Sequence, residues 1–93
     1  MALPQNYNEL SWKARKLIRE EYVKIQRGKC CHCGENLDSS PPESILKLHI
    51  NKNLFPPNFF KHPVHLHHSH ETGMTIGAVH SCCNAVLWQY HED

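Results

Sequence analysis

The chain has 93 residues, of which 40% are hydrophobic and 20% are charged, and its formal net charge at pH 7 is +1. These values fit one small folded domain over residues 1–93, and they exclude a fully disordered chain or a second core. The sequence lacks an apolar run of the roughly 18 residues that a membrane helix needs. It also lacks the basic and apolar regions of a signal peptide at its start. We therefore expect a cytoplasmic protein that does not contact a membrane.

The first expected element is a helix over about residues 8–27, where apolar residues recur at helical spacing. Asn6 or Asn8 can cap its start, and Gly28 can end it. The simplest interpretation is a helix that packs on the core and exposes a charged face. A sharper interpretation places its basic face near a polyanion, because neutralising phosphates releases counterions. In that case the DNA-contacting residues would be Lys13, Lys16, Arg19 and Arg27.

Five cysteines and nine histidines are many for so short a chain. A domain of this size buries little apolar surface and usually needs a metal, disulfides or a partner subunit for stability. An odd number of cysteines fits a disulfide framework poorly, and Cys together with His in a reducing compartment indicates metal binding.

A Cys-x-x-Cys-Gly turn at residues 30–34 has the spacing of half a tetrahedral zinc site. The same two-residue spacer recurs at residues 80–83, so the two segments together predict one structural Zn²⁺ site, a zinc knuckle. Its expected ligands are Cys30, Cys33, His80 and Cys83.

Alternatives to this ligand set stay open. Cys31, His32 and Cys82 are neighbours of the expected ligands, and any of them could take a neighbour's place. Cys82 in place of His80 is the poorer choice, because adjacent cysteines bind one ion with poor geometry. A redox-active Cys-x-x-Cys pair is a further alternative.

Residues 35–62 predict an irregular loop with one short strand or helical turn at 44–50, because proline and asparagine are frequent there. The last third then predicts strand, turn, strand and helix. The strands are expected at 64–68 and 74–79, and the helix from residue 83 or 84 to residue 91.

Four histidines, His65, His67, His68 and His70, lie within six residues around the first of these strands. Alternation along a strand puts His65 and His67 on one face and His68 on the other. One histidine could then hold a divalent ion while another acts as a general base, which suffices for phosphodiester hydrolysis. A second structural zinc site or simple solvent exposure is the alternative.

Taken in order, three segments resemble the motifs of the HNH, or His-Me finger, endonucleases, most closely the branch of the phage recombination endonuclease VII. That branch has Cys-x-x-Cys-Gly, then Asp-His-Asp-His-x-Thr-Gly, then Gly-x-x-Cys-x-x-Cys-Asn. The matching segments here are Cys30-x-x-Cys33-Gly34, then His67-His68-Ser69-His70-Glu71-Thr72-Gly73, then Gly77-x-x-His80-x-x-Cys83-Asn84.

The resemblance implies an α+β fold in which a small ββα-metal core, over about residues 64–92, joins an N-terminal helix and the zinc knuckle. It implies a metal-dependent DNA endonuclease that nicks DNA or cuts both strands. By position, His68 matches the general base, His67 a ligand of the divalent ion, and Asn84 a second ligand or positioning residue.

The chain departs from the branch at the two aspartates, which are His67 and Ser69 here. A site without these carboxylates attracts hard Mg²⁺ less, so Mn²⁺, Ni²⁺, Co²⁺ and Zn²⁺ are also candidates for the catalytic ion. His91 is a second choice in place of Asn84, because seven helical residues rise about 10 Å, too far for both to bind one ion.

The remaining candidates have expected supporting roles. His65 and His70 are expected to support rather than catalyse, and Trp88 and Tyr90 to pack rather than to stack on bases. DNA is the expected partner, with phage packaging or recombination proteins and a homodimer as further possibilities, in the host cytoplasm if a phage encodes the chain. The alternative function is a non-catalytic zinc module that binds DNA or a protein.

Overall fold

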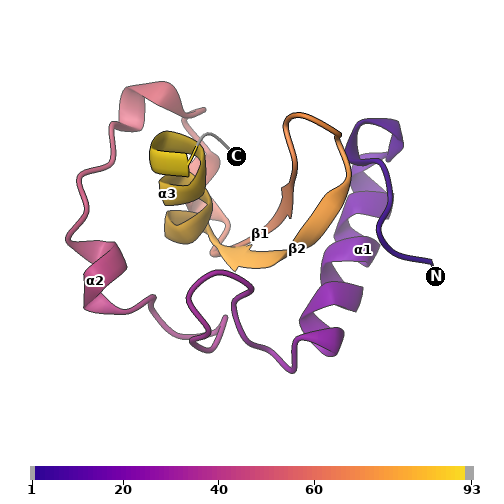
Figure 1. The fold of residues 1–93 in the computed structure, drawn as a ribbon, viewed down its shortest axis with the longest axis horizontal. Helices are drawn as coiled ribbons and strands as arrows, with labels where there is room; N and C mark the ends of the chain where they lie inside the picture. The colour runs from indigo at the N-terminus through magenta and orange to yellow at the C-terminus, as the bar shows by residue number, and fades with distance from the viewer. Residues whose placement is uncertain (1, 92–93) are drawn as a thin grey trace.

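The computed structural model describes residues 2–91. Two antiparallel strands form a hairpin at its centre, with one long helix on one side and the C-terminal helix on the other (Figure 1). The described residues therefore form a small α+β fold with one two-stranded sheet. In chain order the helices and strands are α1 (Trp12–Ile25), α2 (Glu43–Leu46), β1 (Val64–His68), β2 (Thr75–His80) and α3 (Ser81–His91).

Helix α1 is shorter than the expected helix over residues 8–27. It begins after Ser11, whose hydroxyl accepts the Ala14 amide at 3.1 Å, and a separate 3-10 turn, Tyr7–Glu9, precedes it. At the other end Arg27 takes the left-handed conformation (φ 57°), and the Gly28 amide donates to the Val23 carbonyl at 2.8 Å. This bonding pattern satisfies the last carbonyls of the helix and ends it.

The β hairpin matches the expected pattern closely. Strand β1 has the expected bounds, whereas β2 is shifted one residue from the expected 74–79. The register pairs Leu66 with Ala78 and His67 with Gly77, and then shifts, so that His68 pairs with Thr75. Such an irregularity increases the local twist of a strand and redirects its side chains.

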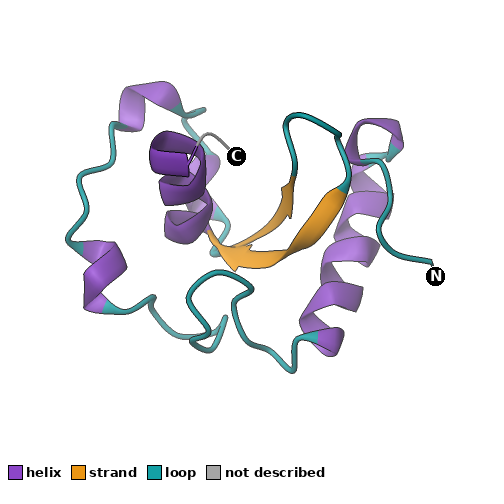
Figure 2. Ribbon diagram, viewed as in Figure 1, coloured by secondary structure: helices purple, strands orange, loops and turns teal. Residues whose placement is uncertain are grey.

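Helix α3 follows β2 without a loop, because His80 ends the strand and Ser81 begins the helix. The helix therefore begins two residues before the expected position 83. Residue 92, the expected last residue of the core, lies outside the described residues. Most of the chain between α1 and β1 is loop (Figure 2). A strand or helical turn was expected at 44–50, and the structure has a helical turn there, the short helix α2.

Helix α1 is tied to β2 by the side chain of Gln26. Its amide nitrogen donates to the Ala78 carbonyl, and its amide oxygen accepts the Ala78 amide, both at 2.9 Å. The Cys31 amide donates to the same carbonyl at 2.9 Å. A Cβ at the neighbouring Gly77 would lie 2.7 Å from Gln26 Oε1 and 2.9 Å from Cys31 Sγ, so any larger residue would force one of these side chains to move.

The N-terminal segment lies along the turn of the hairpin. The Tyr7 amide donates to the Gly73 carbonyl at 2.8 Å, and the Thr75 amide donates to the Gln5 carbonyl at 2.8 Å. Gly73 has a φ of 78°, a conformation that glycine adopts without strain. These bonds bring Tyr7 next to the end of β1, where the histidines lie.

The core is small and lies between α1, the hairpin and the knuckle turn. Its most deeply buried large side chains are Ile18, Val79 and Cys83. Tyr22 closes one end of it with a hydrogen bond of 2.9 Å between its hydroxyl and that of Thr75. No helix among the described residues is long and apolar enough to span a bilayer.

Candidate functional site

Four metal-binding side chains meet where the knuckle turn contacts the junction of β2 and α3. The Sγ atoms of Cys30, Cys33 and Cys83 and one ring nitrogen of His80 all lie within 4.8 Å of one another. Residues 80 and 83 come together because the strand passes directly into a helical turn. The four residues that the spacing predicted could therefore hold one metal ion.

The ring of His80 is oriented for this role. Its Nε2 atom lies 2.9 Å from the Asn36 carbonyl oxygen and 2.8 Å from that of Ser39. Carbonyl oxygens only accept, so Nε2 carries the proton and the lone pair is on Nδ1. Nδ1 lies 3.4 Å from Cys33 Sγ and 3.7 Å from Cys83 Sγ, toward the centre of the cluster. Backbone partners of this kind fix the tautomer of metal-binding histidines.

The thiols of the cluster are strongly polarised. The side chain of Cys83 donates to Cys30 and lowers the pKa of the Cys30 thiol to about 3, and backbone amides add to this effect. The same hydrogen bond raises the pKa of Cys83. Three thiols and one imidazole are a donor set consistent with a structural zinc, and four protein ligands leave no open position for chemistry.

Neither of the alternative cysteines joins this cluster. Cys31 is exposed and lies against Gly77, and Cys82 is half-buried on α3. All five cysteines are free of disulfides. The geometry therefore favours the ligand set with His80.

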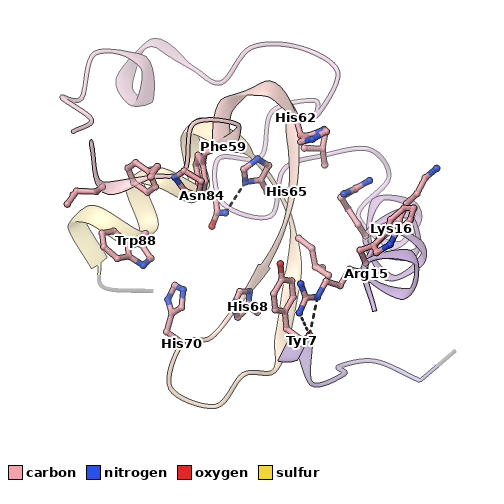
Figure 3. Close-up of a pocket in the computed structure, with 17 residues that line it drawn as sticks. Tyr7, Arg15, Lys16, Phe59, His62, His65, His68, His70, Asn84 and Trp88 are labelled. Carbon is pink, nitrogen blue, oxygen red and sulfur yellow. Dashed lines mark hydrogen bonds between the residues drawn. The ribbon is translucent and has the colours of Figure 1, made fainter. Parts of the chain in front are cut away.

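A hollow of about 780 Å³ lies over β1, between α1 on one side and α3 with the segment of residues 54–62 on the other (Figure 3). Helix α1 contributes three cations to it, Arg15, Lys16 and Arg19. None of the described residues that line it is Asp or Glu. Although the net charge of the chain is only +1, this hollow is a positive site suited to an anion.

His68 enters the hollow from the end of β1. Its ring stacks on that of Tyr7, with centroids 3.7 Å apart and planes 6° from parallel. The guanidinium of Arg15 lies 3.9 Å from the centroid of the Tyr7 ring and must therefore take the opposite face. Arg15 also donates to the Tyr7 carbonyl at 3.0 and 3.2 Å. The position of His68 is thus set by α1 and the N-terminal segment together.

The charge state of His68 follows from these surroundings. Burial lowers the pKa of His68 below its ordinary value of 6.5, and the neighbouring rings of His70 and His67 and the charge of Arg15 lower it further. The imidazole is therefore neutral at pH 7 and can accept a proton. The His70 ring lies 5.1 Å from it, centroid to centroid.

Asn84 faces the same hollow from α3. Its Nδ2 atom lies 3.1 Å from His65 Nδ1. An amide nitrogen only donates, so His65 is the acceptor and the Asn84 oxygen is turned away from it into the hollow (Figure 3). Burial lowers the pKa of His65, which keeps this acceptor neutral. The ring of Phe59 packs on that of His65, with ring centroids 4.5 Å apart. His65 thus positions Asn84, a supporting role.

Two predicted site residues do not line the hollow. His67 is 5% exposed, and its ring lies close enough to His68 to lower the pKa of His68. His91 lies beside His32 at the knuckle turn, with ring centroids 6.2 Å apart.

The four predicted DNA-contacting residues separate in space. Lys16 and Arg19 line the hollow, whereas Lys13 lies over the Trp12 ring at 5.9 Å and Arg27 lines a second, smaller hollow. The roles of Arg15 and Tyr7 were missed. The apolar face of the helix gives no reason to single out Arg15, and Tyr7 is 61 positions from its partner His68.

Comparisons with protein-family models, with curated proteins and with solved structures find no match to this chain.

Proposed function

We propose that the chain is a metal-dependent DNA endonuclease of the HNH type that hydrolyses phosphodiester bonds in the hollow over β1. One observation carries the proposal. A neutral histidine, His68, and an amide oxygen, that of Asn84, face one hollow lined by three cations and, among the described residues, by no carboxylate. The order β1, β2, α3 supports the ββα-metal core that the motifs imply.

His68 is the general base. A water molecule in the hollow gives a proton to a ring nitrogen of His68, and its oxygen forms the new bond to phosphorus while the bond to the leaving oxygen breaks. The stack on Tyr7 holds the ring in place for this transfer. The cations of α1, chiefly Arg15 and Lys16, bind the phosphates and stabilise the negative charge that grows in the transition state.

Asn84 would hold the divalent ion through its side-chain oxygen, which His65 keeps turned into the hollow. Such an ion would stabilise charge on the phosphate and assist the leaving oxygen. An amide oxygen beside imidazoles, without a carboxylate, fits Mn²⁺, Co²⁺, Ni²⁺ or Zn²⁺ better than Mg²⁺. His67 is the other expected ligand; it is buried and does not line the hollow, and its role as a ligand stays a prediction.

The Cys30, Cys33, His80 and Cys83 cluster would hold a structural Zn²⁺. It joins the knuckle turn to the start of α3, where His80 comes four residues before Asn84 and Cys83 comes directly before it. The zinc thus stabilises the element that carries Asn84 and takes no part in the reaction.

A supercoiled-plasmid cleavage assay tests the proposal. Protein that retains its zinc is incubated with excess Mg²⁺, Mn²⁺ or Ni²⁺, or without added ion. We expect ion-dependent nicked or linear product, which His68→Ala reduces by roughly 10²- to 10⁴-fold, as for loss of a general base. His91→Ala is the matched control, because His91 is an exposed histidine outside the hollow and its loss should leave the rate unchanged.

The result that would overturn the proposal is equally definite. A folded protein with one zinc per chain that cuts with none of these ions is the non-catalytic zinc module instead. Cleavage that survives in His68→Ala, at unchanged zinc content, would remove His68 from the role of base.

A further inference from the structure

The hollow over β1 has two chemically different walls. Helix α1 provides the cations together with one aromatic side chain, Trp12, and the opposite wall is aromatic, with Phe55, Phe59 and Trp88. Figure 3 shows Arg15 and Lys16 on one side, Trp88 on the other, and His68 and His70 between them. A ligand that spans the hollow therefore meets positive charge at one end and an aromatic surface at the other.

Trp88 is supported but not covered. Its ring meets that of Phe55 at 5.6 Å and 67°, and Phe55 in turn packs on Phe59 at 4.6 Å. A neighbour that stands nearly perpendicular to the indole covers at most one of its two faces. The side chain stays 40% exposed although it lines the hollow. Trp88 thus packs, as expected from the sequence, and also offers surface to a ligand.

An unpaired nucleotide matches both walls. Its phosphate pairs with the cations, and its base can stack on an aromatic face, which is worth roughly 5- to 150-fold in affinity per base. A base inside a duplex is already stacked on its neighbours and must first be extruded to reach such a side chain. A hollow of about 780 Å³ is also within the usual size range of small-ligand pockets, roughly 300–1,000 Å³.

We infer that this hollow binds single-stranded nucleic acid, with a base on Trp88 and the backbone phosphates along Arg15, Lys16 and Arg19. The inference rests on the proposed function and specifies its substrate as a strand with unpaired bases. Every base has a face that stacks, so we expect binding to be independent of sequence, without hydrogen bonds to base edges.

Fluorescence anisotropy tests this inference without any cleavage step. The probes are a short labelled DNA strand, the same strand in a duplex, and the RNA strand of equal sequence, with zinc retained and no divalent ion added. We expect the DNA strand to bind at least about tenfold more tightly than the duplex. Similar affinity for the RNA strand would show that the 2′-hydroxyl is not read, and much weaker RNA binding would restrict the ligand to DNA.

The matched variants are three. Trp88→Leu keeps the apolar bulk but removes the aromatic face, so it should lose about tenfold in single-strand affinity and leave duplex binding unchanged. Trp88→Phe keeps a face and should retain most of the affinity. Tyr90→Leu removes a 47% exposed aromatic ring of the same helix that does not line the hollow, and should change nothing. Circular dichroism and zinc content establish that each variant is folded.

The outcomes separate this inference from the proposed nuclease. Equal binding of strand and duplex overturns the strand preference, and full single-strand affinity in folded Trp88→Leu overturns the stacking of a base on Trp88, even where the plasmid is cut. Single-strand preference that depends on Trp88, in a protein that cuts neither the plasmid nor single-stranded DNA with Mg²⁺, Mn²⁺ or Ni²⁺, supports the inference and overturns the nuclease.

Discussion

Histidine positions in this chain show how strongly the surroundings of one residue decide its chemistry. His65 and His68 belong to one strand, and burial lowers the pKa of both. His65 accepts a hydrogen bond from Asn84, which occupies its Nδ1 lone pair. His68 instead faces the hollow and stacks on the ring of Tyr7, which also contacts the guanidinium of Arg15. One histidine is therefore suited to positioning and the other to proton transfer.

The lowered pKa of His68 leads to a prediction for the pH dependence of cleavage. Only the neutral imidazole accepts a proton, so the single-turnover rate should fall as the pH drops through the pKa of His68, which lies below 6.5, and should be level near pH 7. The measurement is a pH–rate profile, with zinc content checked at each pH. A rate that keeps rising well above pH 8 would contradict the assignment of His68 as the base.

At the scale of elements, the contact of α1 with β2 depends on two residues that carry no charge. Gln26 bonds both backbone groups of Ala78 and takes the place of a further strand at this edge. Gly77 leaves room for it, because a Cβ there would clash with Gln26 and Cys31. Helix α1 supplies one wall of the hollow, so this contact sets the distance of the cations from β1.

Gly77→Ala should therefore destabilise the protein by about 1–3 kcal/mol, the usual cost of overpacking. Urea unfolding of the zinc-bound protein measures this. Ile76→Ala is the neighbouring control, because Ile76 is 44% exposed and its truncation should cost no more than about 0.5 kcal/mol. Equal stability of the two variants would show that Gln26 and Cys31 move aside without cost.

For the whole molecule, the small core contributes little to the free energy of folding. The largest fully buried side chains are only Ile18, Val79 and Cys83, and the long segment from residue 26 to residue 63 is mostly loop. Zinc at a site of four protein ligands supplies on the order of 10 kcal/mol of folding free energy. This is comparable with the total stability of a small domain, about 5–15 kcal/mol.

Removal of zinc by a strong chelator should therefore unfold the protein. The helical circular dichroism signal should disappear as one zinc per chain is released. Cys33→Ser should behave as the chelated protein does. Cys31→Ser and Cys82→Ser should keep both zinc and fold, because neither cysteine belongs to the cluster. Zinc loss in Cys82→Ser alone would mean that the ligand set differs from the one proposed.

Much of this architecture was predictable because it depends on short stretches of chain. The alternation at 64–68 predicted β1 at its observed bounds, and the two-residue spacers predicted the four clustered residues. The bounds of α1 were not predicted, because the Ser11 cap begins the helix, and the left-handed Arg27 ends it, within the expected range of residues 8–27. Periodicity reports the face of a helix better than its ends.

The sequence by itself determined the metal-binding cluster, the hairpin and the candidate base, since ligand spacing and strand alternation are properties of local geometry. Only the tertiary structure decided which side chains share the hollow. It placed His65 on Asn84, and brought Tyr7 and Arg15 to His68. These contacts join segments far apart in the chain, and they depend on the packing of α1 and the N-terminal segment against the hairpin, which no local pattern encodes.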